Sequence, residues 1–497
     1  MVRECILAID QGTTNTKALL VDRTGSPAFR VSQQVPLTTT AEGFTEQDPE
    51  VLWESVVKVI SRAVEYGKAH KHSIQAIAIS NQRETALAWD VESGKASVPA
   101  ISWQCGRGTT ICARLADSAP DVRARTGLPL APLISATKWA WLLENNAAIA
   151  GLAEEKRLRL GTVDTWLIHK LTVGGENVTD LTNASRTGLL NLASLEWDRK
   201  MLDLFGIALD VLPGLRSSAS HFGGCKAIPE LDGVPIASAI GDSHAAMFGH
   251  GRFHVGAIKA TYGTGSSLMA LTPALVSDTE QLARTIAWSI GDKTQYALEG
   301  NIAMTGSAIQ WLGDFLGFKK PTADLVRLAA TVDSSDGVFF VPAMVGLGAP
   351  HWDAEARGAI LGLSRHHTSA HLARAAVECI AFQIADVFFA MEAAGGIPFK
   401  ELRSDGGATR NASLMQFQAD LLERPLLRSL NEELSALGAA WLAGLTLGWW
   451  RSPEELEGLP CTSHRFEPVL ESRRRAMLYE GWKAAVRRVR SGQGVNA

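Results

Sequence analysis

Two short turns rich in Gly and Thr, each enclosed by apolar runs, constrain the fold of this chain more than any other feature. The segment "CILAID", residues 5–10, precedes "QGTTNT", and "KALLVD", residues 17–22, follows it. Short apolar flanks around turn residues predict two strands joined in a hairpin. A related pattern, "AIKATY", "GTGS" and "SLMAL", spans residues 257–271. The sequence therefore indicates two similar halves.

The rest of the chain alternates predicted strands and helices. "SIQAIAIS", residues 73–80, predicts a buried strand that runs into the polar cluster "NQRET". "DPEVLWESVVKVISRAVEYG" begins with an Asp-Pro helix start, and "TGSAIQWLGDFLG" and "AHLARAAVECIAFQIADVFFAME" have helical spacing. This alternation predicts an α/β protein. We expect two domains, residues 1–250 and 251–497, divided near the glycine-rich "GHGRFHVG".

Composition argues against several classes of partner. The 497 residues are 46% hydrophobic and 20% charged, which is typical of a folded protein. A net charge of -4 gives no electrostatic reason to expect nucleic acid or a membrane as partner. The six cysteines form no CxxC pair, and the N-terminus lacks a signal-like apolar segment, so we expect a cytoplasmic location. No run approaches the roughly 18 apolar residues of a spanning helix.

The C-terminal stretch "RRRAMLYEGWKAAVRRVR" predicts a helix with one apolar face and a basic remainder. A terminal helix with a solvated basic face is favoured over a nucleic-acid or membrane role. The apolar face comprises Leu478, Trp482, Ala485, Val486 and Val489.

No familiar phosphate-binding motif is present, because GxxxxGK[ST] is missing and neither "GTGSSL" nor "GLGAPH" completes GxGxxG. The turns Gly12–Thr14 and Gly263–Gly265 can instead offer N–H groups and hydroxyls to phosphate oxygens across a cleft. Asp10, beside the first turn, could hold Mg²⁺ or its waters against a polyphosphate. Arg83 and Glu84 offer donors and an acceptor that suit a polyol. Plain hairpins and a surface ion pair are the structural alternatives.

The segment "AIGDSHAAMFG", residues 239–249, allows three chemical interpretations. A GxSxG nucleophile turn fails, because Ala245 stands where the second glycine is required. An Asp242–His244 metal pair lacks a neighbouring His or Cys cluster. Asp242 at a strand end remains as a general base for phosphoryl transfer.

Many segments in one order resemble the FGGY carbohydrate kinases, and within them the glycerol kinase branch. The resemblance covers nearly the whole chain, and "GAILGLSRHHTSAHLARAAVE", residues 358–378, is similar to the second family signature. Further matching segments are "AIDQGTTNTKALLVD", "AISNQRETALAWD", "GTVDTWLIHKLT", "TDLTNASRTGLLNL", "AIGDSHAAMFGHG", "TYGTGSS", "GLGAPHWDAEARGAILGL" and "DGGATRNASLMQFQADLL".

The resemblance implies two actin-like, ribonuclease-H-like domains that close over ATP and substrate in an interdomain cleft. It implies that Asp242 takes the proton from the attacking hydroxyl and that Asp10 lies near Mg²⁺ and the phosphates. Arg83, Glu84 and Trp103 match substrate-pocket positions, two for hydroxyls and one as an apolar wall. The positions that match nucleotide contacts are Gly12, Thr13, Thr14, Lys17, Thr264, Gly306, Gln310, Gly407 and Asn411.

The departures from the glycerol kinase pattern lie mostly in the implied pocket. Leu133 replaces a Tyr, Ser243 replaces the Gln after the catalytic Asp, and Ser267 replaces a Phe. Near the phosphates, Lys17 replaces an Arg, which keeps the charge but loses the bidentate fork. We expect a roomier pocket, in which a longer polyol places a further hydroxyl against Ser243 or Ser267.

The sequence leaves alternatives for the substrate and for the function. Neighbouring residues could fill the pocket so that glycerol remains the substrate, or a tetritol, pentitol, erythrulose or pentulose could bind there. A non-catalytic, actin-like ATP-binding sensor is disfavoured by the retained Asp10, Arg83, Glu84 and Asp242. The family resemblance also implies a homodimer or homotetramer.

Overall fold

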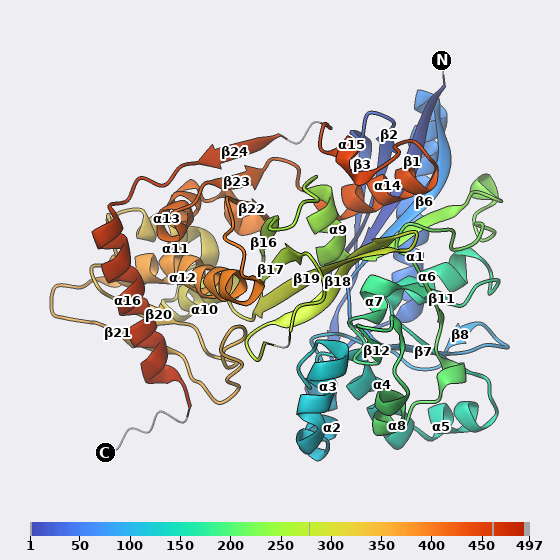
Figure 1. The fold of residues 1–497 in the computed structure, drawn as a ribbon, viewed down its shortest axis with the longest axis horizontal. Helices are drawn as coiled ribbons and strands as arrows, with labels where there is room; N and C mark the ends of the chain where they lie inside the picture. The colour runs from blue at the N-terminus through green and yellow to red at the C-terminus, as the bar shows by residue number, and fades with distance from the viewer. Residues whose placement is uncertain (1, 278, 460–461, 492–497) are drawn as a thin grey trace.

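The first hairpin forms the centre of a five-stranded sheet in the computed structural model, which describes residues 2–277, 279–459 and 462–491 (Figure 1). Its strand order is β15-β6-β1-β2-β3. β1 pairs antiparallel with β2 and parallel with β6. The predicted hairpin and the predicted strand at residues 73–80 are therefore both confirmed. The strands are β1 (Arg3–Gln11), β2 (Asn15–Asp22), β3 (Pro27–Gln34), β6 (His72–Asn81) and β15 (Ile236–Gly241).

The second hairpin forms the centre of a seven-stranded sheet with order β18-β19-β17-β16-β22-β23-β24. Its five strands β19-β17-β16-β22-β23 repeat the order and directions of β3-β2-β1-β6-β15, with two antiparallel pairs followed by two parallel pairs. The predicted similarity of the two halves is confirmed at the level of topology. The strands are β16 (Ile258–Tyr262), β17 (Ser266–Thr272), β18 (Ala283–Ile290), β19 (Lys293–Ile302), β22 (Leu402–Asp405), β23 (Leu426–Ser429) and β24 (Ser463–Phe466).

Helices cover both faces of the first sheet. α1 (Pro49–His70) begins at the predicted Asp-Pro pair, where the Asp48 side chain accepts hydrogen bonds from two backbone N–H groups. Val56 and Val59 of α1 are fully buried against this sheet. The opposite face is covered by α9 (Asp242–Gly249) and α14 (Leu434–Thr446).

The helix α14 comes from the second half of the sequence but packs on the first sheet (Figure 1). It approaches α9 closely, because a Cβ added at Gly438 would lie 1.9 Å from the carbonyl oxygen of Ala245. The approach is close enough that only glycine fits at this position. The helix that begins with Asp242 is thereby held between the first sheet and the C-terminal part of the chain.

Helices also cover the second sheet, and the predicted helices of this half are confirmed. α12 (Ser369–Gly395) runs through its core with α10 (Gly306–Phe315) and α13 (Ala412–Leu422). α16 (Ser472–Val489) packs Trp482 against Phe382 in a parallel stack, with ring centroids 5.2 Å apart. The Trp482 indole donates to Asp386 at 2.7 Å, so the apolar face of the C-terminal helix is used inside the molecule.

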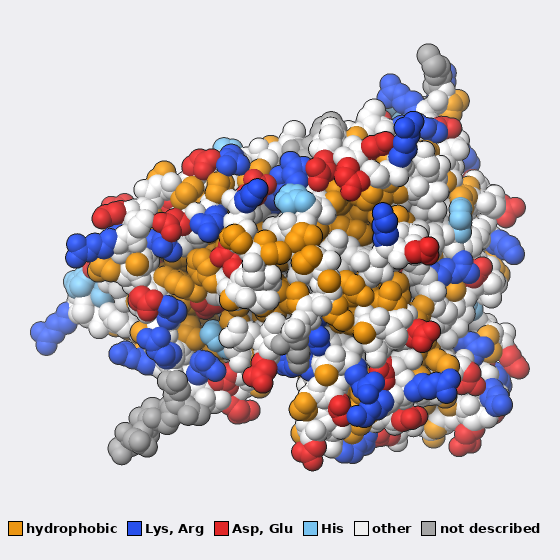
Figure 2. All heavy atoms as spheres, viewed as in Figure 1, with side chains coloured by type: hydrophobic (Ala, Val, Ile, Leu, Met, Phe, Trp, Pro, Cys, Tyr) orange, Lys and Arg blue, Asp and Glu red, His pale blue; other side chains and the backbone are white. Residues whose placement is uncertain are grey.

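The remaining elements build a lobe below the first sheet and complete the second half (Figure 1). Basic and acidic side chains are interspersed on the face that Figure 2 shows. No helix in the described ranges is both long and apolar enough to cross a membrane. The helices not yet given are α2 (Thr109–Arg114), α3 (Ala119–Thr126), α4 (Ser135–Asn145), α5 (Ala147–Glu154), α6 (Val163–Leu171), α7 (Leu181–Ala184), α8 (Arg199–Phe205), α11 (Pro321–Ala329) and α15 (Pro453–Leu456). The short strands are β4 (Thr38–Thr39), β5 (Thr45–Gln47), β7 (Leu87–Asp90), β8 (Lys95–Ala96), β9 (Ala100–Ile101), β10 (Leu158–Gly161), β11 (Val178–Asp180), β12 (Leu190–Asn191), β13 (Glu196–Trp197), β14 (Gly214–Arg216), β20 (Phe339–Val341) and β21 (Ala359–Leu361).

Candidate active site

Asp242 lies where two parallel strands of the first sheet end. Gly241, the last residue of β15, pairs with Asn81, the last residue of β6. Asp242 begins α9, and Arg83 follows β6 by two residues, so the two side chains emerge at the same edge of the sheet. A Cβ at Gly241 would lie 2.8 Å from side-chain carbons of Arg83, and the glycine therefore makes room for the arginine.

A chain of charged side chains links Asp242 to the substrate positions implied by the sequence. Arg83 Nε lies 3.4 Å from Asp242 Oδ1, and its Nη1 lies 2.6 Å from Glu299 Oε1. Arg186 then joins Glu299 Oε2 at 2.7 Å to Glu84 Oε1 at 2.6 Å. The structure thus brings Arg83, Glu84 and Asp242 into one network.

Arg186 and Glu299 are the two members of this network that sequence reasoning missed. Both side chains are almost fully buried, at 2% and 0% exposed. Buried charges are rare unless they are paired, so these two side chains hold the others in place. The only sequence signal was a carboxylate inside the apolar strand "YALEGNI", residues 296–302.

Ser243 and Ser267, two of the predicted pocket residues, lie next to each other beside Asp242. Their Oγ atoms lie 3.2 Å apart, and the Ser243 backbone N–H donates to Asp242 Oδ1 at 2.6 Å. The buried Lys259 Nζ donates to Ser243 Oγ at 2.8 Å. Ser267 Oγ lies 3.4 Å from Glu299 Oε1, so the two serines connect to the same charged network.

The electrostatic environment of Asp242 suits a proton acceptor. Burial raises the pKa of Asp242, and the positive charge of Arg83 partly opposes this. The side chain is nevertheless 38% exposed, so a substrate hydroxyl can reach it. For Glu299, burial would raise the pKa, but Arg186 and Arg83 outweigh it and hold this carboxylate ionised. A carboxylate with a raised pKa is a stronger base toward an alcohol.

Asp10 and Lys17 lie at the base of the first hairpin and face each other across β1 and β2. Asp10 Oδ1 accepts a hydrogen bond from Ser80 Oγ at 2.8 Å. Burial raises the pKa of Asp10 to about 6, although Lys17 opposes the shift. A nearly buried carboxylate that has one hydroxyl donor fits a hard cation such as Mg²⁺. Lys17 Nζ pairs with Glu433 at 2.7 Å, and its side chain remains 27% exposed.

The first turn also contacts the predicted apolar wall. The Trp103 indole N–H donates to Thr13 Oγ1 at 2.9 Å, and Trp103 is 36% exposed. A large exposed aromatic ring held by a hydrogen bond presents an apolar surface at low entropic cost. Gly12 and Thr14 complete the turn, in which the Gly12 N–H donates to the carbonyl oxygen of Asn15 at 2.9 Å.

The second turn is packed against the N-terminus of α10. The N–H groups of Gly306 and Ser307 donate to the carbonyl oxygens of Gly263 and Thr264 at 3.1 and 3.0 Å. A Cβ at Gly306 would lie 2.5 Å from the Gly263 carbonyl oxygen, so glycine is required there. These helix amides are therefore used to hold the turn, while the Thr264 side chain is exposed.

The other predicted nucleotide positions lie on neighbouring elements of the second half. Gln310 projects from α10, where its amide donates to Asp314 at 3.0 Å and accepts from Thr322 at 2.8 Å. Asn411 caps α13, because its Oδ1 accepts from the Leu414 N–H at 3.1 Å. Gly407 has open space where a Cβ would be. Their contact with a nucleotide stays a prediction.

Leu133 lies in the turn before α4, two residues ahead of Ser135. The Ser135 hydroxyl donates to the Glu84 carbonyl oxygen at 3.1 Å. Glu84 itself has a left-handed backbone with φ of 60°, a conformation that is uncommon for a residue with a side chain. The Lys138 ammonium donates to the Leu133 carbonyl oxygen, and burial lowers the pKa of Lys138 to about 7.

The other interpretations of residues 239–249 do not fit the geometry. Ser243 Oγ contacts Lys259 and Ser267, while His244 is fully buried with its Nε2 3.3 Å from Thr285 Oγ1. Burial lowers the pKa of His244 well below its ordinary value, so this side chain is neutral. In the described ranges, the one His, Cys, Asp and Glu grouping with metal-ligand spacing is elsewhere, at Asp336, His366 and His367.

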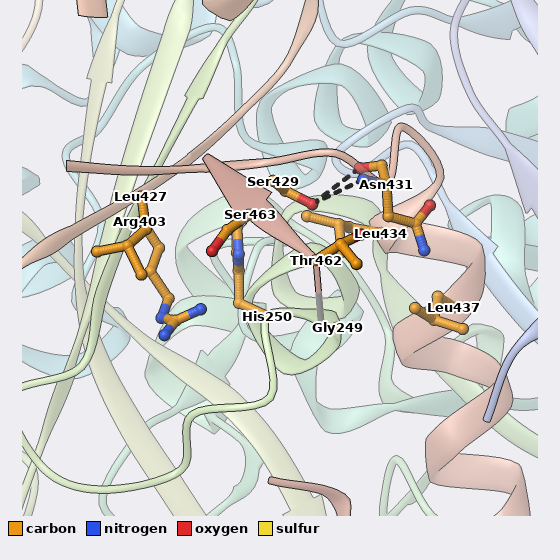
Figure 3. A pocket seen from close by; sticks show the side chains of 10 residues that line it. All are labelled: Gly249, His250, Arg403, Leu427, Ser429, Asn431, Leu434, Leu437, Thr462 and Ser463. Carbon is orange, nitrogen blue, oxygen red and sulfur yellow. Dashed lines mark hydrogen bonds between the residues drawn. The ribbon is translucent and has the colours of Figure 1, made fainter. Parts of the chain in front are cut away.

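A separate pocket lies at the opposite end of α9 from Asp242 (Figure 3). His250, which follows α9, joins Asp405 there at 2.9 Å through Nε2. None of the predicted site residues lines it. Its lining comprises Gly249, His250, Arg403, Leu427, Ser429, Asn431, Leu434, Leu437, Thr462 and Ser463.

Solved structures with the same arrangement are two-domain kinases. Plasmodium falciparum glycerol kinase with ADP superimposes with a TM-score of 0.91, at 33% sequence identity and 98% coverage of both chains. Ligand-bound xylulose kinase from Lactobacillus acidophilus shares the fold, with a TM-score of 0.88 at 24% identity and 99% coverage of both chains. The fold is therefore the two-domain α/β architecture of sugar and polyol kinases.

The sequence comparisons define the family. The models for the N-terminal and C-terminal domains of the FGGY family of carbohydrate kinases match residues 5–249 and 258–447. Glycerol kinases from Paraburkholderia phytofirmans and Paraburkholderia xenovorans are 44% and 43% identical over 490 residues, with 98% coverage of each chain. This chain belongs to the FGGY family of carbohydrate kinases, and it is an ATP-dependent kinase of the sugar and polyol class.

Proposed function

We propose that this kinase transfers the γ-phosphoryl group of ATP to a primary hydroxyl of glycerol or a glycerol-like small polyol. The observation that carries the proposal is the Asp242 carboxylate, which is open to solvent and linked to Arg83 at 3.4 Å. Two similar proteins that match 98% of this chain are named glycerol kinase. A non-catalytic sensor would have no need for a base with a raised pKa at this position.

In the proposed reaction, Asp242 accepts the proton of the attacking hydroxyl as its oxygen bonds to the γ-phosphorus. The bond from the γ-phosphorus to its bridging oxygen breaks, and ADP leaves. Arg83 and Glu84 orient the other substrate hydroxyls, and Trp103 covers the carbon chain. Mg²⁺, held by Asp10 directly or through water, would offset phosphate charge.

The two halves are proposed to divide these tasks. Residues 1–250 supply the base and most of the polyol pocket, to which Ser267 contributes from the second half, and residues 251–497 supply the nucleotide positions. The first turn and Lys17 would contact the phosphates from one side. From the other side, the proposed contacts are Thr264, Gly306, Gln310, Gly407 and Asn411. Closure of the halves would exclude water and limit ATP hydrolysis.

The test is the Asp242→Asn variant, which keeps the shape of the side chain and removes its basicity. We expect kcat to fall by about 10² to 10⁴-fold, the usual contribution of a positioned general base. ATP binding, measured by calorimetry, should persist. Asp203→Asn, an exposed change on α8, is the matched control and should keep wild-type kcat. A kcat within threefold of wild type for Asp242→Asn would exclude Asp242 as the base.

A cytoplasmic location is also proposed, from the scattered cysteines without a CxxC pair, and a homodimeric or homotetrameric state, from the family resemblance. Size-exclusion chromatography with light scattering measures the second property directly. A monomer at micromolar concentration would contradict the proposed assembly.

A further inference from the structure

We infer that the pocket beside Asp242 selects an acyclic polyhydroxy substrate of four or more carbons, and that the hydroxyls of Ser243 and Ser267 bind its additional hydroxyl group. The inference rests on the proposed kinase function and names the substrate class of the same site. It starts from the contact between the two serines, whose Oγ atoms lie 3.2 Å apart next to the proposed base.

The two serine hydroxyls belong to the lining of the substrate pocket. Ser243 directly follows Asp242, and its N–H donates to the Asp242 carboxylate at 2.6 Å. Ser267 reaches the same lining from β17 through Glu299, which in turn holds Arg83 at 2.6 Å. Neither serine is buried completely. A ligand that contacts Asp242 and Arg83 therefore has the serine pair as its next polar neighbour.

The side chains of Lys259 and Glu299 determine the direction of the hydrogen bonds that the two serines make. An ammonium group can only donate, so Lys259 Nζ occupies a lone pair of Ser243 Oγ at 2.8 Å. An ionised carboxylate can only accept, so Ser267 directs its hydrogen toward Glu299 Oε1 at 3.4 Å. Without substrate, Ser243 therefore donates its hydrogen to Ser267 Oγ, 3.2 Å away, and Ser267 keeps one further lone pair.

An alcohol group is the ligand that matches this polarity. A substrate hydroxyl can replace Ser267 as the acceptor of the Ser243 hydrogen and can donate its own hydrogen to Ser267, whereas a methyl group can do neither. A carboxylate could accept from Ser243, but it would face the lone pairs of Ser267 and the charge of Glu299. The serine pair is therefore suited to a further hydroxyl on the substrate.

The serine pair is held rigidly by buried charges. Lys259 and Glu299 are both fully buried on strands of the second sheet. Lys259 also donates to Thr261 Oγ1 at 2.9 Å, and Glu299 is fixed by Arg83 and Arg186. Burial of two charges is costly unless each is paired. Because Lys259 and Glu299 are fixed, the serine hydroxyls that they contact are fixed as well. Donors and acceptors in fixed positions discriminate most strongly between substrates.

Both serines are also short side chains, so they leave the adjacent space to the substrate. A three-carbon substrate that contacts Asp242, Arg83 and Glu84 has no hydroxyl left for the serine pair. A four-carbon chain has one, which is the reason for the lower limit of four carbons.

The first experiment is an ADP-release assay with the full-length protein and a panel of alcohols. The panel contains glycerol, erythritol, both threitols, erythrulose, the pentitols and the pentuloses. We expect kcat/KM for the best substrate of four or five carbons to exceed that for glycerol at least tenfold. Glycerol as the best substrate by tenfold would overturn the inference and leave the proposed function intact. No substrate-dependent ADP release with any alcohol would overturn the proposed function itself.

The second experiment tests the two serines through the selectivity ratio, which is kcat/KM for the best longer substrate divided by kcat/KM for glycerol. Ser243→Ala and Ser267→Ala should each lower this ratio about threefold to tenfold, the usual effect of one lost neutral hydrogen bond. Ser267→Phe should lower it further, because the ring fills the space for the fourth carbon. An unchanged ratio in all three variants would overturn the role of the serines.

Ser55→Ala is the matched control, because it removes a buried hydroxyl pair of the same kind outside the pocket. Ser55 Oγ lies 2.6 Å from Thr16 Oγ1 between α1 and β2. We expect an unchanged selectivity ratio in this variant. A fall in the ratio as large as that of Ser243→Ala would show that the pocket variants act through general stability and would count against the inference.

Discussion

The two hairpins at the centres of the two sheets have the same topology, but they carry different types of side chain at equivalent positions. In the first, Asp10 faces Lys17 in register and neighbours Ser80 on β6. In the second, Thr261 faces Ser267 in register and neighbours Asp405 on β22. The position that holds a carboxylate and an ammonium in one half therefore holds two hydroxyls in the other.

Next to the hydroxyl row, Asp405 lies on β22, and two further charges lie one row deeper, on β16 and β19. Met269 pairs with Lys259 on one side and with Glu299 on the other. The partly exposed row above them carries the hydroxyls, which the buried charges orient. A repeated fold thus carries a charged pair on one hairpin and, on the other, hydroxyls that are oriented by buried charges.

The largest loss of stability is expected from Glu299→Gln, which removes the charge of the buried carboxylate on the second sheet. Arg83 and Arg186 would then be left without their shared partner. Loss of one member of a buried ion pair costs about 3–5 kcal/mol of unfolding free energy. Chemical denaturation measures this directly. As control, Glu144→Gln breaks an exposed pair with Arg114 and should cost about 1 kcal/mol or less; equal costs for the two variants would contradict the prediction.

The second largest loss of stability is expected at the contact between α14 and α9, which joins the two halves. Gly438→Ala should lower stability by about 1–3 kcal/mol, because its Cβ would overlap the Ala245 carbonyl and push α14 from α9. Gly151→Ala in α5 is the matched control, since nothing lies near its Cβ, and it should be neutral or stabilising. Thermal unfolding compares the two variants. A Gly438→Ala protein as stable as wild type would show that the helices separate without cost.

Asp10→Asn tests the charged pair of the first half. We expect the Mg²⁺ concentration for half-maximal activity to rise at least about tenfold, because the candidate ligand loses its charge. Burial raises the pKa of Asp10 to about 6, so the folded protein holds this proton more tightly than the unfolded chain does. Stability from this carboxyl group is therefore present at low pH and is lost as the pH rises through about 6.

The same variant accordingly gives a second readout. The melting temperature of Asp10→Asn, relative to wild type, should increase between pH 5 and pH 8 in the absence of ligands. A variant that becomes relatively less stable toward pH 8 would show that the pairing of Asp10 with Lys17 outweighs the cost of burial.

The smallest effects are expected when threonine hydroxyls are removed from the two turns. These variants test whether each half contacts a different substrate. Thr264→Ala should raise KM for ATP about twofold to fivefold and leave KM for the alcohol nearly constant, since one neutral hydrogen bond is lost. Thr13→Ala also releases the Trp103 indole, so it should raise KM for both substrates. Steady-state kinetics with each substrate varied distinguishes the two variants. Identical patterns would contradict the proposed division.

Local patterns in the sequence predicted much of the fold and part of the candidate site. The hairpins, the strand at residues 73–80 and the helix at Asp48 follow from apolar periodicity and from turn and capping residues, which act over a few neighbours. Arg83 lies within three residues of the end of a predicted strand, and Asp242 lies at the end of another. Long matches to one family added the fold class and the remaining positions.

The rest depended on contacts between distant segments, which periodicity does not record. No residue near Ser243 in the sequence predicts its contact with Lys259. Likewise, no residue near Arg83 predicts its contact with Glu299, which is 216 residues away. The return of α14 to the first sheet likewise needs the close approach of Gly438 and Ala245. Sequence alone determined the two halves and the proposed base. Only the tertiary structure decided how buried charges on the second sheet orient the serine pair, because long-range pairing in a low-dielectric interior depends on three-dimensional packing.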